Sequence, residues 1–296
     1  MYFRVLGGLE VVDGGRSVEL GGRKQRAVLA ALLLDAPRPV SLDRLIEILW
    51  GDDAPDRAEV SVQAYVSNLR RLLEPNRRPR EEPALLVTRP AGYVLALARD
   101  ASDASVFEDL VTEGQALRLQ GHHSAAAEVL TRAVSMWAPV LPEFAGEAFV
   151  RESVARLESL HAVALEELFD TRLELGEHRA LVPDLEAAVE TYPLHERLWG
   201  DLALAHYRCG HQTEALRTIQ RARRVLKEEV GLEPGPDLLH LEAEMLSHAP
   251  RLRPPEGTAA TEAVDPRPGR PPAGSDRGIF VGRDRELQLL IEATTK

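Results

Sequence analysis

Apolar and polar residues alternate along the first twenty positions of the chain, which is the pattern of a half-buried β-strand. The turn sequence Asp13-Gly14-Gly15 interrupts the alternation with residues that tolerate positive φ. The apolar positions on either side of the turn are Phe3, Val5, Leu9, Val11, Val18 and Leu20. The pattern predicts a small antiparallel sheet at the start of the chain.

The apolar spacing then becomes helical and predicts three helices. The first covers residues 23–34. The second follows Ser41, a favourable N-cap, and ends at Gly51. Pro55 is suited to open a third helix that ends before Pro75. The apolar stripe of this third helix consists of Val62, Val66, Leu69 and Leu73.

Residues 84–97 form two apolar runs on either side of Arg89-Pro90-Ala91-Gly92. Two strand-like runs separated by proline and glycine predict a β-hairpin with an arginine at its tip. A sheet, three helices and a terminal hairpin, in this order, are the parts of a winged helix-turn-helix with an additional N-terminal sheet. We therefore assign residues 1–98 to a winged helix-turn-helix DNA-binding domain.

Helical periodicity continues over residues 101–249, and it repeats. The turn glycines Gly176 and Gly210 lie 34 residues apart, which is the period of a tetratricopeptide helix pair. A third unit surrounds Gly121, and an insertion near Trp137-Ala138-Pro139 separates it from the next. Stacked units of this kind share a continuous core, so this region is expected to be one helical-repeat domain.

Residues 250–278 are rich in proline, glycine and charge, which is typical of a linker. The segment that begins with Ile279-Phe280-Val281-Gly282-Arg283 has an ordered pattern again. We expect residues 279–296 to be the start of another domain, truncated at Lys296.

The net charge of −11 at first argues against a nucleic-acid partner, because phosphate contacts require lysine and arginine. The charge is unevenly distributed, however. Residues 1–98 carry 14 basic and 13 acidic side chains, so the acidic excess belongs to the remainder. The basic side chains of the first part crowd into one stretch: Arg70, Arg71, Arg77, Arg78, Arg80 and Arg89. Such local density suits a phosphate backbone.

Other classes of protein are disfavoured. The sequence has no apolar run long enough for a membrane helix and no secretory signal, so a cytoplasmic protein without membrane contact is expected. Cys209, the single cysteine, favours a buried structural thiol. The nine histidines are scattered, and the motifs of hydrolases, zinc proteases and phosphate-binding loops are absent from the sequence. We predict neither a metal site nor an enzymatic activity for this chain.

Three segments together resemble the Streptomyces antibiotic regulatory proteins. They are Gly22-Arg23-Lys24-Gln25-Arg26, residues 62–72 (VQAYVSNLRRL), and Arg89-Pro90-Ala91-Gly92-Tyr93. The resemblance implies a mainly α fold with a small β component: an OmpR-type winged helix-turn-helix followed by a tetratricopeptide-like bacterial transcriptional activation domain at 101–249. Residues 279–296 resemble the entry to the ATPase domain of larger members. No cofactor is expected in this chain, and ATP or ADP would bind only in the missing downstream domain.

The family resemblance also implies function. It suggests an activator of an antibiotic or other secondary-metabolite gene cluster, which binds direct repeats in promoter DNA as a tandem dimer and recruits RNA polymerase. The short acidic loop between the second and third helices would contact the σ factor. Its candidate contact residues are Asp52, Asp53, Asp56 and Arg57.

In a winged helix-turn-helix the third helix enters the major groove, where the base edges can be distinguished. Candidates for base edges or the adjacent sugar-phosphate are Ser61, Gln63, Tyr65 and Asn68, and Arg70 and Arg71 are candidates for phosphates. Arg89 could enter the minor groove. Tyr93 could either bond a phosphate or pack on the core, and Lys24 with the start of the first helix could hold another phosphate or simply be exposed.

Two alternatives remain at this point. The chain could be a repeat-protein adaptor whose winged helix binds protein and never DNA. It could also be the regulatory arm of a signalling ATPase, with its output set by the nucleotide state of a downstream domain.

Overall fold

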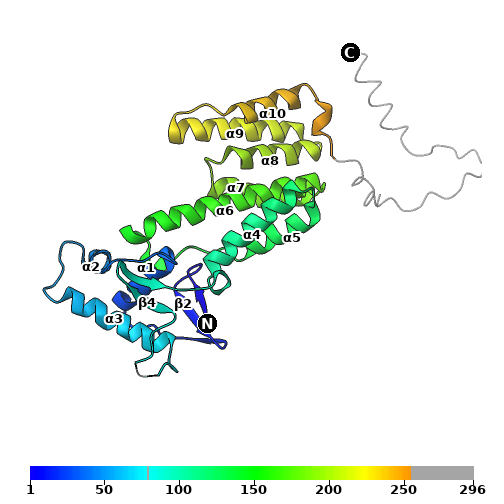
Figure 1. Cartoon of the computed structure of the whole chain (residues 1–296). Helices are drawn as coiled ribbons and strands as arrows, with labels where there is room; N and C mark the ends of the chain where they lie inside the picture. The colour runs from blue at the N-terminus through cyan, green and yellow to red at the C-terminus, as the bar shows by residue number, and fades with distance from the viewer. Residues whose placement is uncertain (79, 255–296) are drawn as a thin grey trace, which may run out of the picture. The chain divides into compact units, whose positions relative to one another are not determined.

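The computed structural model describes residues 1–78 and 80–254, and it begins with the predicted antiparallel sheet (Figure 1). Strands β1 (Tyr2–Arg4), β2 (Glu10–Asp13) and β3 (Arg16–Ser17) pair in that order. The turn between β2 and β3 contains Gly14 and Gly15, both with positive φ, as the sequence predicted.

Three helices follow, α1 (Arg23–Asp35), α2 (Leu42–Trp50) and α3 (Ala58–Leu73). The Ser41 hydroxyl accepts a hydrogen bond from the Arg44 N–H at 3.1 Å, which confirms the predicted N-cap of α2. Gly51 ends this helix with a φ of 57°. The predicted start of α3 at Pro55 is wrong. Pro55 belongs to a separate turn in which its carbonyl accepts the Ala58 N–H, and the helical ladder begins only with Ser61 N–H to the Arg57 carbonyl.

The wing is the predicted hairpin of β4 (Leu86–Arg89) and β5 (Gly92–Leu95), with Arg89 opposite Gly92. Tyr93 and Val40 exchange two backbone hydrogen bonds of 2.8 and 2.9 Å, so the segment before α2 joins the hairpin. Gly92 is required here, since its φ is 135° and an added Cβ would lie 2.0 Å from the Val40 carbonyl oxygen. The winged helix-turn-helix is thus present as predicted.

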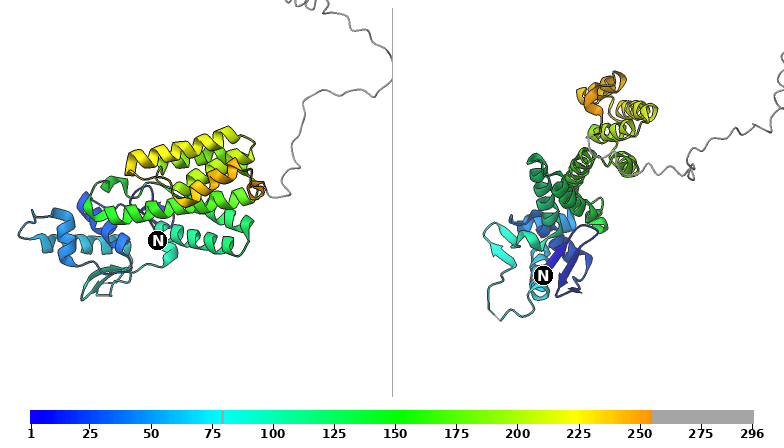
Figure 2. Two further views of the ribbon diagram at one scale, coloured as in Figure 1. Left: turned by 90° about the horizontal axis from the view of Figure 1, so that it is seen from above. Right: turned by 90° about the vertical axis from the view of Figure 1, so that its right-hand side faces the viewer.

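The rest of the described chain consists of helices, stacked in successive pairs (Figure 2). They are α4 (Asp103–Leu119), α5 (His123–Ser135), α6 (Ala148–Glu174), α7 (His178–Thr191), α8 (Glu196–Arg208), α9 (Gln212–Val230) and α10 (Pro236–Leu246). Gly121, Gly176 and Gly210 occupy equivalent turns after α4, α6 and α8, with φ of 78°, 81° and 82°. This equivalence confirms the repeat register read from the sequence. None of the helices in residues 1–78 and 80–254 is both long enough and apolar enough to cross a membrane.

The buried residues form two clusters that meet along α6. The first contains the interior of the winged part together with Phe107, Phe144 and Leu157. The second joins the C-terminal half of α6 to α7, α8, α9 and α10. It also includes Leu252 from a 3-10 turn at Pro250–Leu252, so the first residues of the predicted linker are packed. Residues 255–278 of the predicted linker and the predicted domain start at 279–296 lie outside the described residues.

The predicted insertion after Trp137 packs directly against the N-terminal sheet. Val140 forms a β-bridge with Leu6, and the Gly7 N–H donates to the Pro139 carbonyl at 2.9 Å. Two acidic side chains reinforce this junction. Asp103 accepts the backbone N–H groups of Val5 and Leu6, and Glu143 accepts that of Leu9 and an N–H of Arg26. The winged part and the first helices therefore form one packed unit.

Candidate nucleic-acid interface

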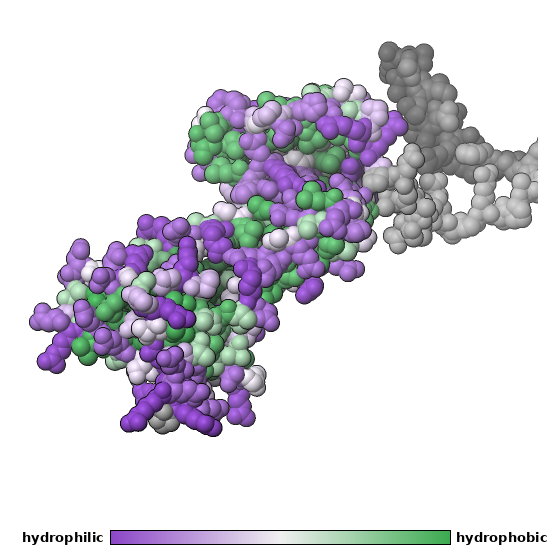
Figure 3. Space-filling view, viewed as in Figure 1, coloured by the Kyte–Doolittle hydropathy of each residue, from purple (hydrophilic) through white to green (hydrophobic). Residues whose placement is uncertain are grey.

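Helix α3 has one buried side and one free side, as a recognition helix requires. The predicted stripe of Val62, Val66, Leu69 and Leu73 is at most 2% exposed. The opposite side is exposed along several turns and consists of Val60, Gln63, Ala64, Ser67 and Arg71. Figure 3 shows hydrophobic residues set among hydrophilic ones over this part of the molecule. The free side could lie in a major groove, because nothing else in the described residues covers it.

The structure places the predicted base-reading residues at different depths. Gln63 is exposed, whereas Ser61 and Asn68 are half-buried at one edge of the free side. The Ser61 hydroxyl donates to the Arg57 carbonyl at 3.2 Å, and Asn68 accepts a hydrogen bond from the Arg71 guanidinium. Gln63 is thus the freest of the predicted polar groups.

Tyr65 lies nearer the interior than the sequence analysis placed it. Its ring is half-buried and packs against the first core cluster. The reason is helical geometry: Tyr65 follows Val62 by three positions and precedes Leu69 by four, so it borders the buried stripe. Only the margin of its side chain faces the free side of α3.

Arg70 connects α3 to the wing. Its Nε donates to the Leu86 carbonyl at 2.8 Å and its guanidinium donates to the Thr88 hydroxyl at 2.7 Å. The guanidinium also lies 6.0 Å from the centre of the Tyr93 ring, and burial lowers the pKa of Arg70. Tyr93 itself is half-buried and packs on the core cluster. Both residues therefore fix the angle between recognition helix and wing.

The tip of the wing carries a free cation. Arg89 is exposed, and its side chain has no hydrogen bond or ion pair to any of residues 1–78 and 80–254. Lys24, at the start of α1, is also exposed, and its ammonium lies 4.2 Å from the centre of the Trp50 ring. Gly22 is the N-cap of this helix, so no capping side chain bonds the N–H groups of the first turn. Both cations are accessible to phosphate.

The arginines between α3 and the wing are partly committed to neighbouring acids. Arg77 lies 3.8 Å from Glu74 and donates to the Glu81 carbonyl. The Glu81 carboxylate accepts the backbone N–H of Arg78 at 2.9 Å. The positive charge of this segment is therefore smaller than the count of arginines suggests.

The acidic loop before α3 is exposed throughout, from Gly51 to Arg57. The carboxylates of Asp52, Asp53 and Asp56 have no ion pair within the described ranges. Arg57 occupies the N-cap of α3. The loop therefore presents three free negative charges directly beside the recognition helix.

Sequence reasoning missed Val60 and Ser67 on the free side of α3, and it did not propose Ala64 as a contact. Their positions follow from the buried stripe, since residues 60, 64, 67 and 71 lie opposite 62, 66, 69 and 73 at 3.6 residues per turn. Polarity alone selected the earlier candidates. Exposed apolar residues were left out, although the major groove also offers methyl groups.

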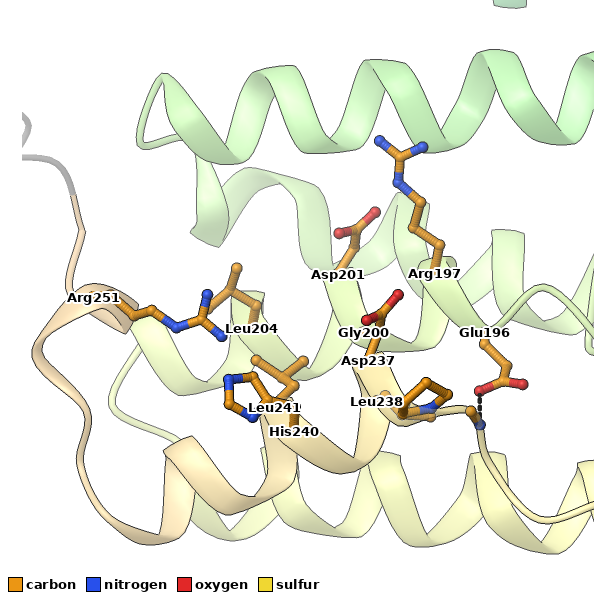
Figure 4. A pocket seen from close by; sticks show the side chains of 12 residues that line it. Glu196, Arg197, Gly200, Asp201, Leu204, Asp237, Leu238, His240, Leu241 and Arg251 are labelled. Carbon is orange, nitrogen blue, oxygen red and sulfur yellow. Dashed lines mark hydrogen bonds between the residues drawn. The ribbon is translucent and has the colours of Figure 1, made fainter.

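The helical part has a cavity of about 650 Å³ between α8 and α10 (Figure 4). Two of its charged groups are bonded within the fold: Glu196 accepts the Gly235 N–H at 2.6 Å, and Arg197 pairs with Glu167 and Asp170. Burial raises the pKa of Asp201 well above its usual range. Among the described residues, no group of three or more histidine, cysteine or acidic side chains is placed to hold a metal ion.

Comparison with known proteins agrees with this architecture. Residues 15–95 match the family described as transcriptional regulatory protein, C terminal. Residues 102–246 match the bacterial transcriptional activator domain.

Several regulators are similar over most of the chain. The regulatory protein AfsR of Streptomyces coelicolor is 34% identical over 302 residues, which is 100% of this chain and 29% of AfsR. The regulatory protein DnrI of Streptomyces peucetius is 31% identical over 85% of this chain and 94% of DnrI. Among solved structures, that of Mycobacterium tuberculosis EmbR in complex with a low affinity phosphopeptide is similar, with a TM-score of 0.80 and 33% sequence identity. The match covers 84% of this chain and 65% of the EmbR chain. The chain thus spans under a third of AfsR but nearly all of DnrI, and it belongs to the Streptomyces antibiotic regulatory protein family of transcription activators.

Proposed function

We propose that this chain activates transcription by binding direct repeats in the promoter DNA of a secondary-metabolite gene cluster and recruiting RNA polymerase. The observation that carries the proposal is the free side of α3 beside the unpaired Arg89 of the wing. A helix in the major groove and an arginine in the adjacent minor groove would read one half-site together. Two copies on neighbouring repeats would form a tandem dimer.

Within this proposal the residues have different roles in DNA binding. Gln63 and Asn68 contact base edges, while Arg71 and Lys24 contact phosphates. Ser61 and Tyr65 lie at the edge of the helix, where they reach the sugar-phosphate. Arg70 and Tyr93 hold the helix and the wing at a fixed angle. For Arg70 this positioning role replaces the phosphate contact expected from the sequence, and for Tyr93 it corresponds to the expected alternative of packing on the core.

A gel-shift titration with a duplex carrying tandem direct repeats tests DNA binding. We expect affinity to fall steeply between about 50 mM and about 200 mM salt, because bound phosphates release counterions. Arg89→Ala should weaken binding about tenfold or more with an unchanged melting temperature, since an exposed wing tip contributes little to folding. Arg224→Ala is the matched control, because Arg224 is also exposed but lies on α9.

A chain that ignores duplexes at both salt concentrations would contradict the proposal and favour an adaptor that binds only protein. Undiminished affinity of the Arg89→Ala variant would show that the tip of the wing does not contact DNA.

The polymerase contact is tested separately. The triple variant Asp52→Ala, Asp53→Ala, Asp56→Ala should bind DNA at least as well as the unchanged chain, because negative charge next to phosphate is lost. Activated transcription with purified RNA polymerase holoenzyme should fall, and Asp237→Ala on α10 serves as the exposed acidic control. Full activation by the triple variant would exclude this loop as the contact.

A further inference from the structure

Val60 is an exposed apolar residue that contributes little to the stability of the fold. Its side chain is 60% exposed in the first turn of α3. Valine is a poorer helix former than alanine, and a side chain that stays mostly in water contributes little burial energy. Val60 and Ala64 are the apolar residues on the otherwise polar free side of α3, and an exposed valine there suggests a contact made outside the chain.

The neighbours of Val60 on the same face are small. Ala64 lies one turn further along and Ser67 the next, and both are exposed. From Val60 to Ser67 this line carries no long side chain, and Arg71 follows only one turn later, so the backbone of the first half of α3 can approach a surface closely. Glu59, exposed in the same turn, would be repelled by phosphate. These features favour the floor of the major groove over its phosphate rim.

The floor of the major groove presents one apolar group, the C5 methyl of thymine. We infer that Val60 and Ala64 contact thymine methyl groups, and that Gln63, on the same stretch of helix, pairs with the adenine of a neighbouring base pair. The half-site recognised by this chain therefore contains A·T pairs under the first two turns of α3. This inference rests on the proposed DNA binding and specifies what the bound sequence contains.

The test removes single methyl groups from DNA. A tight-binding duplex is first selected from a random library with the full chain, and each thymine is then replaced in turn by deoxyuridine, which lacks only the methyl group. We expect about a fourfold loss of affinity at one or two positions in each half-site, from the burial energy of one methyl group. If no other thymine shows a loss of this size, the affected positions locate the contact.

Variants assign the contact to its residue. Val60→Ala should lose about fourfold on the thymine duplex and should no longer respond to deoxyuridine at one position, because the two changes remove the same contact. Its melting temperature should not fall, since the replaced side chain is exposed. Leu119→Ala, at an 82% exposed position on α4, is the control and should respond to deoxyuridine as the unchanged chain does.

Three results would overturn the inference. Binding that tolerates deoxyuridine at every position shows that no methyl group is read, while leaving DNA binding intact. A Val60→Ala variant with unchanged DNA binding but reduced transcription assigns Val60 to the polymerase surface. Failure of the library selection to yield any bound duplex refutes the DNA-binding proposal itself, and the inference with it.

Discussion

The carboxylate of Asp103 holds the winged part against the helical part, and its removal is the most direct test of that junction. The side chain is 5% exposed and sits at the start of α4. It accepts the N–H of Val5 at 2.9 and 3.0 Å, that of Leu6 at 3.0 Å, and that of Ala104 at 2.7 Å. Two of these donors lie almost a hundred residues away in the sequence.

The magnitude follows from the groups left behind. Asp103→Ala leaves the N–H groups of Val5 and Leu6 buried without a partner, at about 1–3 kcal/mol each. Part of this loss is offset, because burial raises the pKa of Asp103 and the ionised carboxylate is itself costly to bury. We therefore expect a decrease in the free energy of unfolding of about 2–4 kcal/mol. Asp103→Asn keeps one acceptor oxygen and should lose roughly half as much.

Urea unfolding of the full chain, followed by circular dichroism, measures these differences. Asp100→Ala is the matched control, since Asp100 is an exposed acid three residues earlier in the 3-10 turn Arg99–Ala101. Gel shifts on the same variants report whether the junction matters for DNA affinity. If Asp103→Ala changed the unfolding free energy by less than about 0.5 kcal/mol, the value typical of a surface position, the junction would not depend on this carboxylate.

Two further predictions concern single side chains. Arg70→Ala removes two hydrogen bonds between α3 and the wing and should lower the melting temperature by about 2–6 °C. The neighbouring Arg71 is exposed, and Arg71→Ala should leave the melting temperature unchanged. Equal effects of the two variants would contradict the link between α3 and the wing. His161 is buried against Trp137, and burial lowers its pKa to about 4. The unfolded chain therefore takes up a proton first, so stability is full above about pH 6.5 and should decrease by about 3 kcal/mol as the pH falls to about 4. Denaturation of His161→Phe should lack this part of the pH dependence, and an unchanged profile would refute the assignment.

Much of the fold could be predicted because it depends on local sequence patterns. The buried stripe of α3, the N-cap at Ser41 and the hairpin around Arg89 each involve residues within a few positions of one another. The equivalent turns at Gly176 and Gly210 were likewise visible, because a left-handed turn needs glycine and a repeat places it at a constant interval. The start of α3 was missed because a proline is compatible both with a first helical turn and with the separate turn that the structure shows.

The candidate site was predicted less well, because sequence shows charge but not its partners. Arg70 reads as a phosphate ligand, yet it bonds the Leu86 carbonyl, sixteen residues away. Arg77 reads in the same way and is held by Glu74 and Glu81. Arg89 keeps its predicted availability because a two-residue turn leaves no neighbour for it to bond. The presence of a bonding partner within reach in the folded chain, rather than residue type, decided which arginines stayed free.

The junction between the two parts had no signal in the sequence, and it changes how the interface is understood. The interior of the winged part and the residues Phe107, Phe144 and Leu157 belong to one buried cluster. The buried side of α3 is thus packed in the same core as residues of α4, α5 and the N-terminal part of α6. The second half of α6 lies in the other cluster, with α7 to α10. A single 27-residue helix therefore belongs both to the core behind α3 and to the core of the repeats. Any displacement of α6 by a partner bound to the repeats must also be accommodated by the core that supports α3.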